Sequence, residues 1–235
     1  MNKCLDSAAR AVADIHDGAS VMIGGFGEAG SPIELIHALI DQGAKDLTVI
    51  SNNTGSGRVG LAALIAAGRV RKMICSYPRS ANSTVFPELY RQGRIELELT
   101  PQGTLAERIR AGGAGIPAFY TAAAVGTVLA TGKEVRRFDG REFVLEPGLR
   151  ADFALVKAQR GDPYGNLVYH KTARNFGPIM CMAARITIVQ VSELVAPGGL
   201  DPETVITPGI FVQRLVVVAQ PAQESRLVKE GRSYP

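Results

Sequence analysis

Tryptophan is missing from the 235 residues, and aromatic side chains make up only 6 % of them. Proteins that stack the bases of single-stranded nucleic acid need aromatic platforms, so this class is disfavoured. The sequence also lacks a polybasic tract, and its densest basic cluster is only Arg69, Arg71 and Lys72. The net charge of +4 weakly favours small anionic ligands such as phosphates and carboxylates. We therefore expect no nucleic acid partner.

Long apolar runs are also absent, so the sequence predicts no membrane span. The first residues carry no apolar stretch of the kind found in a secretory signal. The three cysteines, Cys4, Cys75 and Cys181, are odd in number and lack C-x-x-C spacing, which suits reduced thiols. No cluster of Cys, His and Asp has the spacing of metal ligands. We expect a cytoplasmic protein that holds no metal.

The apolar residues alternate between strand-like and helix-like segments along most of the chain. Strands are predicted near residues 20–23, 47–50, 70–75, 95–99, 153–156, 167–169, 186–191 and 210–218. Amphipathic helices are predicted near 3–15, from 31, through 61–65, around 88–91 and around 105–109. This alternation predicts an α/β fold, an open and mostly parallel sheet with helices on both faces.

Two segments depart from the alternation. Asp139-Gly140 separates two short strand-like runs and predicts a small β-hairpin insert near 133–146. Residues 220–235 are polar and are predicted to form a loosely ordered tail. Because no linker divides the rest, we expect residues 1–219 to form a single domain.

A glycine-rich turn follows the first predicted strand of the sheet. Gly25-Phe26-Gly27-Glu28-Ala29-Gly30 matches G-x-G-x-x-G, and Ser31, Pro32 and Glu34 then predict a helix start with a capping box. A dinucleotide site would need an acidic residue where the next strand ends, but Ser51-Asn52-Asn53 stands there. The alternatives are a tight turn that needs glycine for its backbone angles, or a turn that approaches another phosphate-bearing or thioester ligand.

Several longer segments point to one family. They are residues 17–32, 51–55, 100–115, 151–158 and 173–176. In these segments the chain resembles the A (alpha) subunits of the family I coenzyme A transferases, over most of residues 14–218. The resemblance implies a CoA-transferase-like fold and a ping-pong transfer in which a glutamate attacks succinyl-CoA and an enzyme-bound CoA thioester forms. The CoA thioester is then a substrate, and no permanently bound cofactor is expected.

The resemblance also implies roles for particular residues. The nucleophilic glutamate belongs to a B subunit, in a heterodimer or heterotetramer, so Glu28, Glu34 and Glu107 are not taken as nucleophiles. Gln102 matches a family glutamine whose amide helps to bind the thioester oxyanion, the alternative being a glutamine that only forms a turn. The residues expected to approach the CoA moiety are Gly24, Gly25, Phe26, Gly27, Glu28, Ala29 and Gly30. Asn52 and Asn53 are candidates for substrate contact or are simply turn formers.

Residues 75–79, 175–180 and 206–214 are similar to the branch of the family that passes CoA to 3-oxoadipate in aromatic catabolism. The alternatives are the branch that uses the 3-oxo acid acetoacetate, and a catalytically silent relative that only binds acyl-CoA. Because 3-oxoadipate carries a second carboxylate, a selective site needs a cation or amide donors at its far end. Arg79, which follows a predicted strand, is the candidate for that contact.

Overall fold

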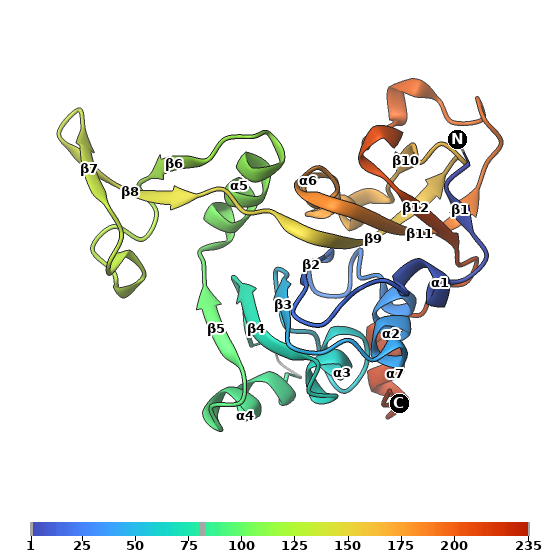
Figure 1. Cartoon of the computed structure of the whole chain (residues 1–235), viewed down its shortest axis with the longest axis horizontal. Helices are drawn as coiled ribbons and strands as arrows, with labels where there is room; N and C mark the ends of the chain where they lie inside the picture. The colour runs from blue at the N-terminus through green and yellow to red at the C-terminus, as the bar shows by residue number, and fades with distance from the viewer. Residues whose placement is uncertain (1, 80–82, 235) are drawn as a thin grey trace.

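Eight strands of the computed structural model form one continuous, parallel path through the main sheet (Figure 1). The structure describes residues 2–79 and 83–234. Within them the order is β1-β12-β11-β9-β2-β3-β4-β5, and a ninth strand, β10, pairs antiparallel with β9. The strands are β1 (Cys4–Leu5), β2 (Ser20–Ile23), β3 (Leu47–Ile50), β4 (Val70–Cys75), β5 (Glu96–Leu99), β9 (Ala151–Gly161), β10 (Leu167–Val168), β11 (Ala184–Leu194) and β12 (Arg214–Val217). The predicted open, mostly parallel α/β sheet is confirmed.

Helices cover both faces of this sheet, as predicted. The helices are α1 (Ala8–Val12), α2 (Ile33–Gln42), α3 (Gly60–Ala66), α4 (Val85–Arg91), α5 (Gln102–Gly113), α6 (Gly177–Ala183) and α7 (Glu224–Lys229). Short 3₁₀ turns are η1 (Val128–Ala130), η2 (Lys171–Arg174), η3 (Pro202–Thr204) and η4 (Gly209–Phe211). Figure 1 shows α5 and α6 on one side of the sheet and α2, α3, α4 and α7 on the other.

The strand side chains divide between two cores because successive residues of a strand point to opposite faces. Val21 and Ile23 of β2 join the core under α1 to α4, whereas Met22 between them joins the core under α5 and α6. All three are at most 1 % exposed. A parallel strand buried on both faces has a continuous apolar run, which is the pattern that predicts this strand.

A second, antiparallel sheet projects from the body of the molecule (Figure 1). It has the order β6-β8-β7, formed by β6 (Ala118–Thr121), β7 (Val135–Phe138) and β8 (Arg141–Pro147). Asp139 and Gly140 have φ of 48° and 74°, the left-handed pair that a tight two-residue hairpin turn requires. The predicted hairpin insert is confirmed, and β6 adds a strand that was not predicted.

Three local predictions were wrong. The expected helix over 3–15 is shorter, because Cys4 and Leu5 form the edge strand β1, which pairs with β12, and Ser7 accepts a hydrogen bond from the backbone N–H of Arg10 to begin α1. The expected strand over 210–218 starts only at Arg214, after η4. The 220–235 segment is not loose over its described part, because it contains α7 and packs on the body.

The predicted capping box of α2 is also wrong. Pro32 stands at the N-cap and no side chain caps the helix there. The Glu34 carboxylate instead accepts hydrogen bonds from Gln190 Nε2 at 2.5 Å and from the Ala222 backbone at 2.6 Å. Tertiary partners far along the chain therefore replace the local cap. In the described part of the chain, no helix is long and apolar enough to cross a membrane.

Candidate active site

Four neighbouring parallel strands end at one edge of the main sheet, and the loops after them enclose a cavity of about 610 Å³. The order of the strands reverses at β2, which lies between β3 and β9, and ligands of open α/β sheets gather at such a point. The loops after β2, β3, β4 and β5 supply the lining: Phe26, Gly27, Asn52, Asn53, Ser56, Ser76, Tyr77 and Gln102. We call this space the edge cavity.

Asn52 is the polar centre of the edge cavity. It is only 3 % exposed, and its Oδ1 accepts hydrogen bonds from Ser76 Oγ at 2.7 Å and from Gln102 Nε2 at 2.9 Å. An amide nitrogen carries two hydrogens, so the Gln102 amide has a second N–H beyond the one that Asn52 binds. Asn52 thereby fixes the position of a neutral donor at the wall of the cavity.

Asn53 also lines the edge cavity and is at the same time a turn former. Its Oδ1 accepts a hydrogen bond from the Gly55 backbone N–H at 2.8 Å, the pattern of an Asx turn. The hydrogen bond shows the turn role of Asn53, and its contact with a substrate stays a prediction.

The glycine loop, residues 24–30, folds into a miniature hairpin. Phe26 and Ala29 exchange backbone hydrogen bonds of 3.0 and 3.3 Å, so Gly27 and Glu28 form the tip. Phe26 is 51 % exposed, and only Phe26 and Gly27 of this loop line the edge cavity. A Cβ on Gly30 would lie 2.4 Å from the carbonyl oxygen of Ala173, so this glycine is required for packing.

The remaining predicted loop residues have other surroundings. Gly24 and Gly25 are buried, and the Glu28 carboxylate accepts hydrogen bonds from Ser225 N and Oγ at 2.6 and 2.9 Å. The N-terminus of α2, which follows this loop, donates the Leu35 backbone N–H to Gln190 Oε1 at 3.3 Å. The part of this loop that faces the edge cavity is therefore its tip and not the helix behind it.

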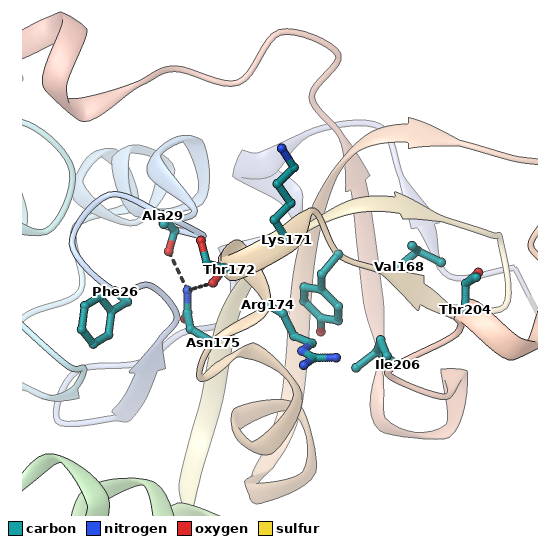
Figure 2. A pocket seen from close by; sticks show the side chains of 10 residues that line it. Phe26, Ala29, Val168, Lys171, Thr172, Arg174, Asn175, Thr204 and Ile206 are labelled. Carbon is teal, nitrogen blue, oxygen red and sulfur yellow. Dashed lines mark hydrogen bonds between the residues drawn. The ribbon is translucent and has the colours of Figure 1, made fainter.

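Ala29 lines a second cavity, of about 1010 Å³, together with residues of η2 (Figure 2). Phe26 borders both cavities. Asn175 Nδ2 donates to the carbonyl oxygens of Ala29 at 2.8 Å and Thr172 at 3.0 Å, which ties the loop to η2. Residues 173–176 carried part of the family resemblance but gave no hint of this role, because it depends on a contact 146 residues along the chain.

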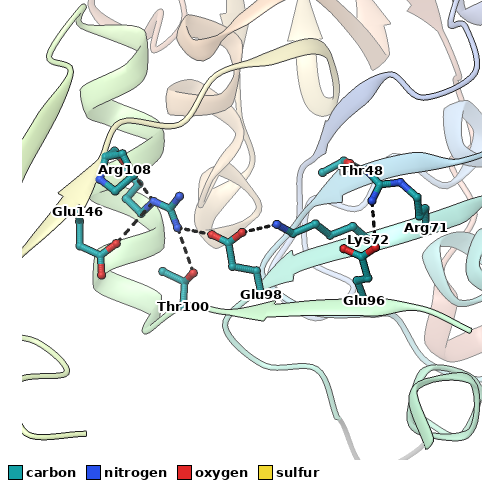
Figure 3. Close-up of polar contacts among 9 residues, drawn as sticks. Thr48, Arg71, Lys72, Glu96, Glu98, Thr100, Arg108 and Glu146 are labelled. Carbon is teal, nitrogen blue, oxygen red and sulfur yellow. Dashed lines mark hydrogen bonds and ion pairs between the residues drawn. The ribbon is translucent and has the colours of Figure 1, made fainter. Parts of the chain in front are cut away.

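Helix α5, which begins at Gln102, is held by a partly buried chain of charged side chains (Figure 3). Arg108 is 6 % exposed and donates to Glu98 Oε1 at 2.8 Å, and Lys72 donates to the other oxygen of Glu98 at 2.6 Å. On the other side lies Glu146, 1 % exposed, which is paired with Lys133 at 2.6 Å. Burial opposes ionisation of Glu98, but the hydrogen bonds from Lys72 and Arg108 hold its pKa below the ordinary value. These contacts fix α5 to β5 and β8.

Arg79 is exposed and is not among the residues that line either cavity. It makes no hydrogen bond or ion pair with another described residue. Its contact with an acceptor stays a prediction.

The other candidate nucleophiles are carboxylates bound to neighbouring residues or thiols that stay protonated. Glu34 is held by Gln190 and Ala222, and Glu107 is paired with Arg110 at 2.6 Å. Burial raises the pKa values of the Cys75 and Cys181 thiols to about 12, so neither is a thiolate at neutral pH. The described lining of the edge cavity includes no carboxylate, and the described residues contain no cluster of three potential metal ligands.

Known proteins share both the sequence and this architecture. The Coenzyme A transferase family pattern matches residues 5–218. The A subunit of 3-oxoadipate CoA-transferase from Pseudomonas putida is 60 % identical over 225 residues, covering 96 % of this chain and 97 % of that one. The A subunit of the probable succinyl-CoA:3-ketoacid coenzyme A transferase of Bacillus subtilis is 52 % identical over 229 residues, covering 97 % of this chain and 94 % of that one.

Solved structures share the fold. Glutaconate coenzyme A-transferase from Acidaminococcus fermentans superposes with a TM-score of 0.81 at 22 % identity, over 94 % of this chain and 78 % of that chain. An acyl-CoA transferase from Escherichia coli gives 0.83 at 24 % identity over 94 % of this chain, which spans about half (50 %) of the length of that chain. Given the match over residues 5–218 and the near-complete coverage of both relatives, this chain belongs to the coenzyme A transferase family.

Proposed function

We propose that this chain is the A subunit of a two-subunit enzyme that moves CoA from succinyl-CoA to 3-oxoadipate. The Pseudomonas putida relative and an Acinetobacter baylyi relative at 58 % identity support the acceptor, since both bear the name of the 3-oxoadipate CoA-transferase. The observation that carries the proposal is the edge cavity. Its walls hold an oriented amide donor, Gln102, but its described lining includes no carboxylate that could act as nucleophile.

The B subunit supplies the glutamate in this proposal. Its carboxylate oxygen attacks the thioester carbonyl carbon of succinyl-CoA, and the carbon–sulfur bond breaks as CoA thiolate leaves. The thiolate then attacks the glutamyl carbonyl of the mixed anhydride, which releases succinate and leaves the CoA thioester on the partner. Transfer to the acceptor carboxylate follows the same steps in reverse.

Gln102 serves the tetrahedral stages of these steps. Each attack places negative charge on a carbonyl oxygen, and a donor that is already positioned stabilises that charge without reorganising. Asn52 gives the Gln102 amide that fixed position, with one N–H left to aim at the oxyanion. A neutral amide also keeps its donor at every pH at which the enzyme works.

The partner must approach the mouth of the edge cavity for its glutamate to reach Gln102. Phe26 and Tyr77 both line this cavity and are 51 % and 60 % exposed. Aromatic residues are enriched in protein–protein interfaces, so these two fit a surface that the B subunit covers. We expect a heterodimer or a heterotetramer of such pairs.

Acceptor choice is the finest part of the proposal. Acetoacetate remains the alternative acceptor, and the Bacillus subtilis relative is named for 3-ketoacid transfer. Arg79→Gln, assayed in the complex with both acceptors, tests whether Arg79 binds the second carboxylate of 3-oxoadipate. A fall of about tenfold in kcat/KM for 3-oxoadipate alone, equal to about 1.4 kcal/mol, supports a contact with the second carboxylate. An equal fall for both acceptors, or none, removes Arg79 from the acceptor site.

The experiment that tests the function is reconstitution. The chain is purified with its co-purifying partner and assayed for CoA transfer from succinyl-CoA to 3-oxoadipate and to acetoacetate. We expect transfer by the complex, with 3-oxoadipate preferred, and none by either chain alone. A complex that binds acyl-CoA and transfers nothing would indicate the silent relative instead.

The compartment, the domain limits and the cofactor requirement belong to the same proposal. Three free cysteines, two of them buried, suit a reducing compartment, which favours the cytoplasm. We take residues 1–219 as a single CoA-transferase A-subunit domain with a hairpin insert near 133–146, followed by the polar C-terminal segment 220–235. The CoA thioester is consumed and reformed as a substrate, so the transfer chemistry needs no permanently bound cofactor.

A further inference from the structure

The C-terminal segment reaches the loops of the edge cavity. We call residues 222–234 the C-terminal strap. It includes α7 and runs beside α2, on the face of the sheet opposite α5 and α6 (Figure 1). Composition alone suggests a solvated tail, yet its contacts with the body are specific and Glu224 is buried.

The first contact of the strap is with the glycine loop. Ser225 donates its backbone N–H and its hydroxyl to the two carboxylate oxygens of Glu28, at 2.6 and 2.9 Å. Glu28 stands at the tip of the miniature hairpin, next to Gly27, which lines the edge cavity. The strap is therefore hydrogen-bonded to the tip of the glycine loop.

The second contact is with the loop after β3. The Glu224 carboxylate, in a residue only 5 % exposed, accepts hydrogen bonds from the side chain and the backbone of Ser56. Ser56 lines the edge cavity. Next to it, a Cβ on Gly57 would lie 2.6 Å from Val228 Cγ2, so the helix packs directly on this backbone. Two loops that come from different strands thus meet on one short helix.

The ends of the strap are anchored on rigid elements. At its start, the Ala222 N–H donates to Glu34 of α2 at 2.6 Å. At its end, the Tyr234 ring stacks on His37 of α2 with centroids 3.7 Å apart, and its hydroxyl donates to Asp41 at 2.6 Å. Burial lowers the pKa of His37, and its Nε2 accepts the Gly60 N–H at 2.9 Å, which favours the neutral ring. Because both ends of the strap are fixed, Glu224 and Ser225 between those ends can fix the positions of the two loops that they contact.

We propose that Glu224 and Ser225 are positioning residues, which set the distance between the glycine loop and the loop after β3 and so shape the edge cavity for the CoA thioester. This role rests on the proposed function, because it assigns the edge cavity to the substrate. Neither side chain lines the cavity. They act through Ser56 and Glu28, and the expected consequence is on substrate binding more than on the chemical step.

The test compares three variants in the complex with the partner chain. Glu224→Ala with Ser225→Ala removes the carboxylate and the hydroxyl. Glu224→Gln with Ser225→Thr keeps an acceptor for Ser56 and a hydroxyl for Glu28. Arg226→Ala is the matched control, since Arg226 lies on the same helix and pairs only with the exposed Glu230 among the described residues, at 2.9 Å. Activity is scaled to the folded fraction of each preparation.

The double alanine variant should raise KM for succinyl-CoA about tenfold while kcat per folded site changes less than about threefold, because misplaced loops weaken binding. The Gln/Thr variant and the control should stay within about twofold of the wild type. Hydrogen exchange at the Ala29 amide, which bonds to Phe26, should quicken only in the double alanine variant. If that variant does not fold, Ser225→Ala alone gives the same comparison with a smaller effect.

Wild-type KM and wild-type exchange in the double alanine variant would overturn the positioning role while leaving the proposed function intact. A wild-type complex that transfers no CoA would overturn the proposed function. Exchange at Ala29 needs no activity, so in that case it still decides whether the strap orders the loop.

Discussion

Glu224 gives the most quantitative prediction about stability. Burial raises the pKa of its carboxyl from the ordinary 4.5 to about 7, and the nearby Glu28 acts in the same direction against the hydrogen bonds from Ser56. Between these two pH values the folded chain keeps a proton that the unfolded chain has released. The free energy of unfolding therefore falls as the pH rises through this window, and levels off above about pH 7. This rise in the pKa of Glu224 corresponds to a change of about 3 kcal/mol in the free energy of unfolding across the window.

Glu224→Gln removes this titration while keeping the size of the side chain and an acceptor for Ser56. At about pH 4 the variant and the wild type should be similarly stable, and at about pH 8 the variant should be the more stable by up to about 3 kcal/mol. Urea unfolding of the complex at a series of pH values measures this. The quantity compared is the difference in free energy of unfolding between variant and wild type, because the titration of the other groups cancels in that difference.

Glu230→Gln is the matched control, because Glu230 lies just after the same helix and is exposed. Its pairing with Arg226 lowers its pKa, so it is ionised throughout the window and its difference from wild type should be flat above about pH 6. The prediction is refuted if the Glu224→Gln difference does not change with pH, or if it grows toward acid.

Three shorter predictions concern the edge cavity and its support. Gln102→Ala should lower kcat about 10²-fold with little change in KM for succinyl-CoA, as expected for one lost oxyanion donor, and a fall below about threefold would return Gln102 to a turn role. Gly30→Ala should destabilise the fold, because its Cβ would meet Ala173, whereas Gly27→Asn, which tolerates the φ of 57° at this position, should chiefly raise KM; equal melting temperatures for the two would contradict this. Arg108→Ala should cost about 1–3 kcal/mol of stability, measured by urea unfolding, because it removes the buried guanidinium that donates to Glu98 and to the Pro147 carbonyl oxygen, and a loss below about 0.5 kcal/mol would argue against that role.

The parts of the fold that the sequence predicts are those set by local pattern. Strands such as 20–23 and 153–156 are buried on both faces, so their composition alone predicts them, and the Asp139-Gly140 turn has the residues that its backbone angles demand. Asn52 and Gln102 were found separately, at a strand end and through family resemblance. Their meeting follows from parallel strands ending at one edge.

The failures have a common physical reason, which is competition from distant partners. Glu34 satisfies a local capping pattern, but its carboxylate binds Ala222, 188 residues along the chain. Glu28 binds Ser225 at a separation of 197 residues, which no local pattern can show. The polar composition of residues 220–235 predicts solvation, yet Ser225 and the hydroxyl of Tyr234 are paired with the body of the molecule. Local sequence patterns do not predict such long-range contacts.

The central claim is that this chain supplies the oxyanion donor and its partner the nucleophile. The complex is incubated with succinyl-CoA, the enzyme-bound thioester is trapped with hydroxylamine, and both chains are digested and read by mass spectrometry. We predict a hydroxamate on one glutamate of the partner chain and none on this chain. A hydroxamate on any carboxylate of this chain, Glu28, Glu34 and Glu107 included, or CoA transfer by rigorously partner-free protein, would contradict the claim.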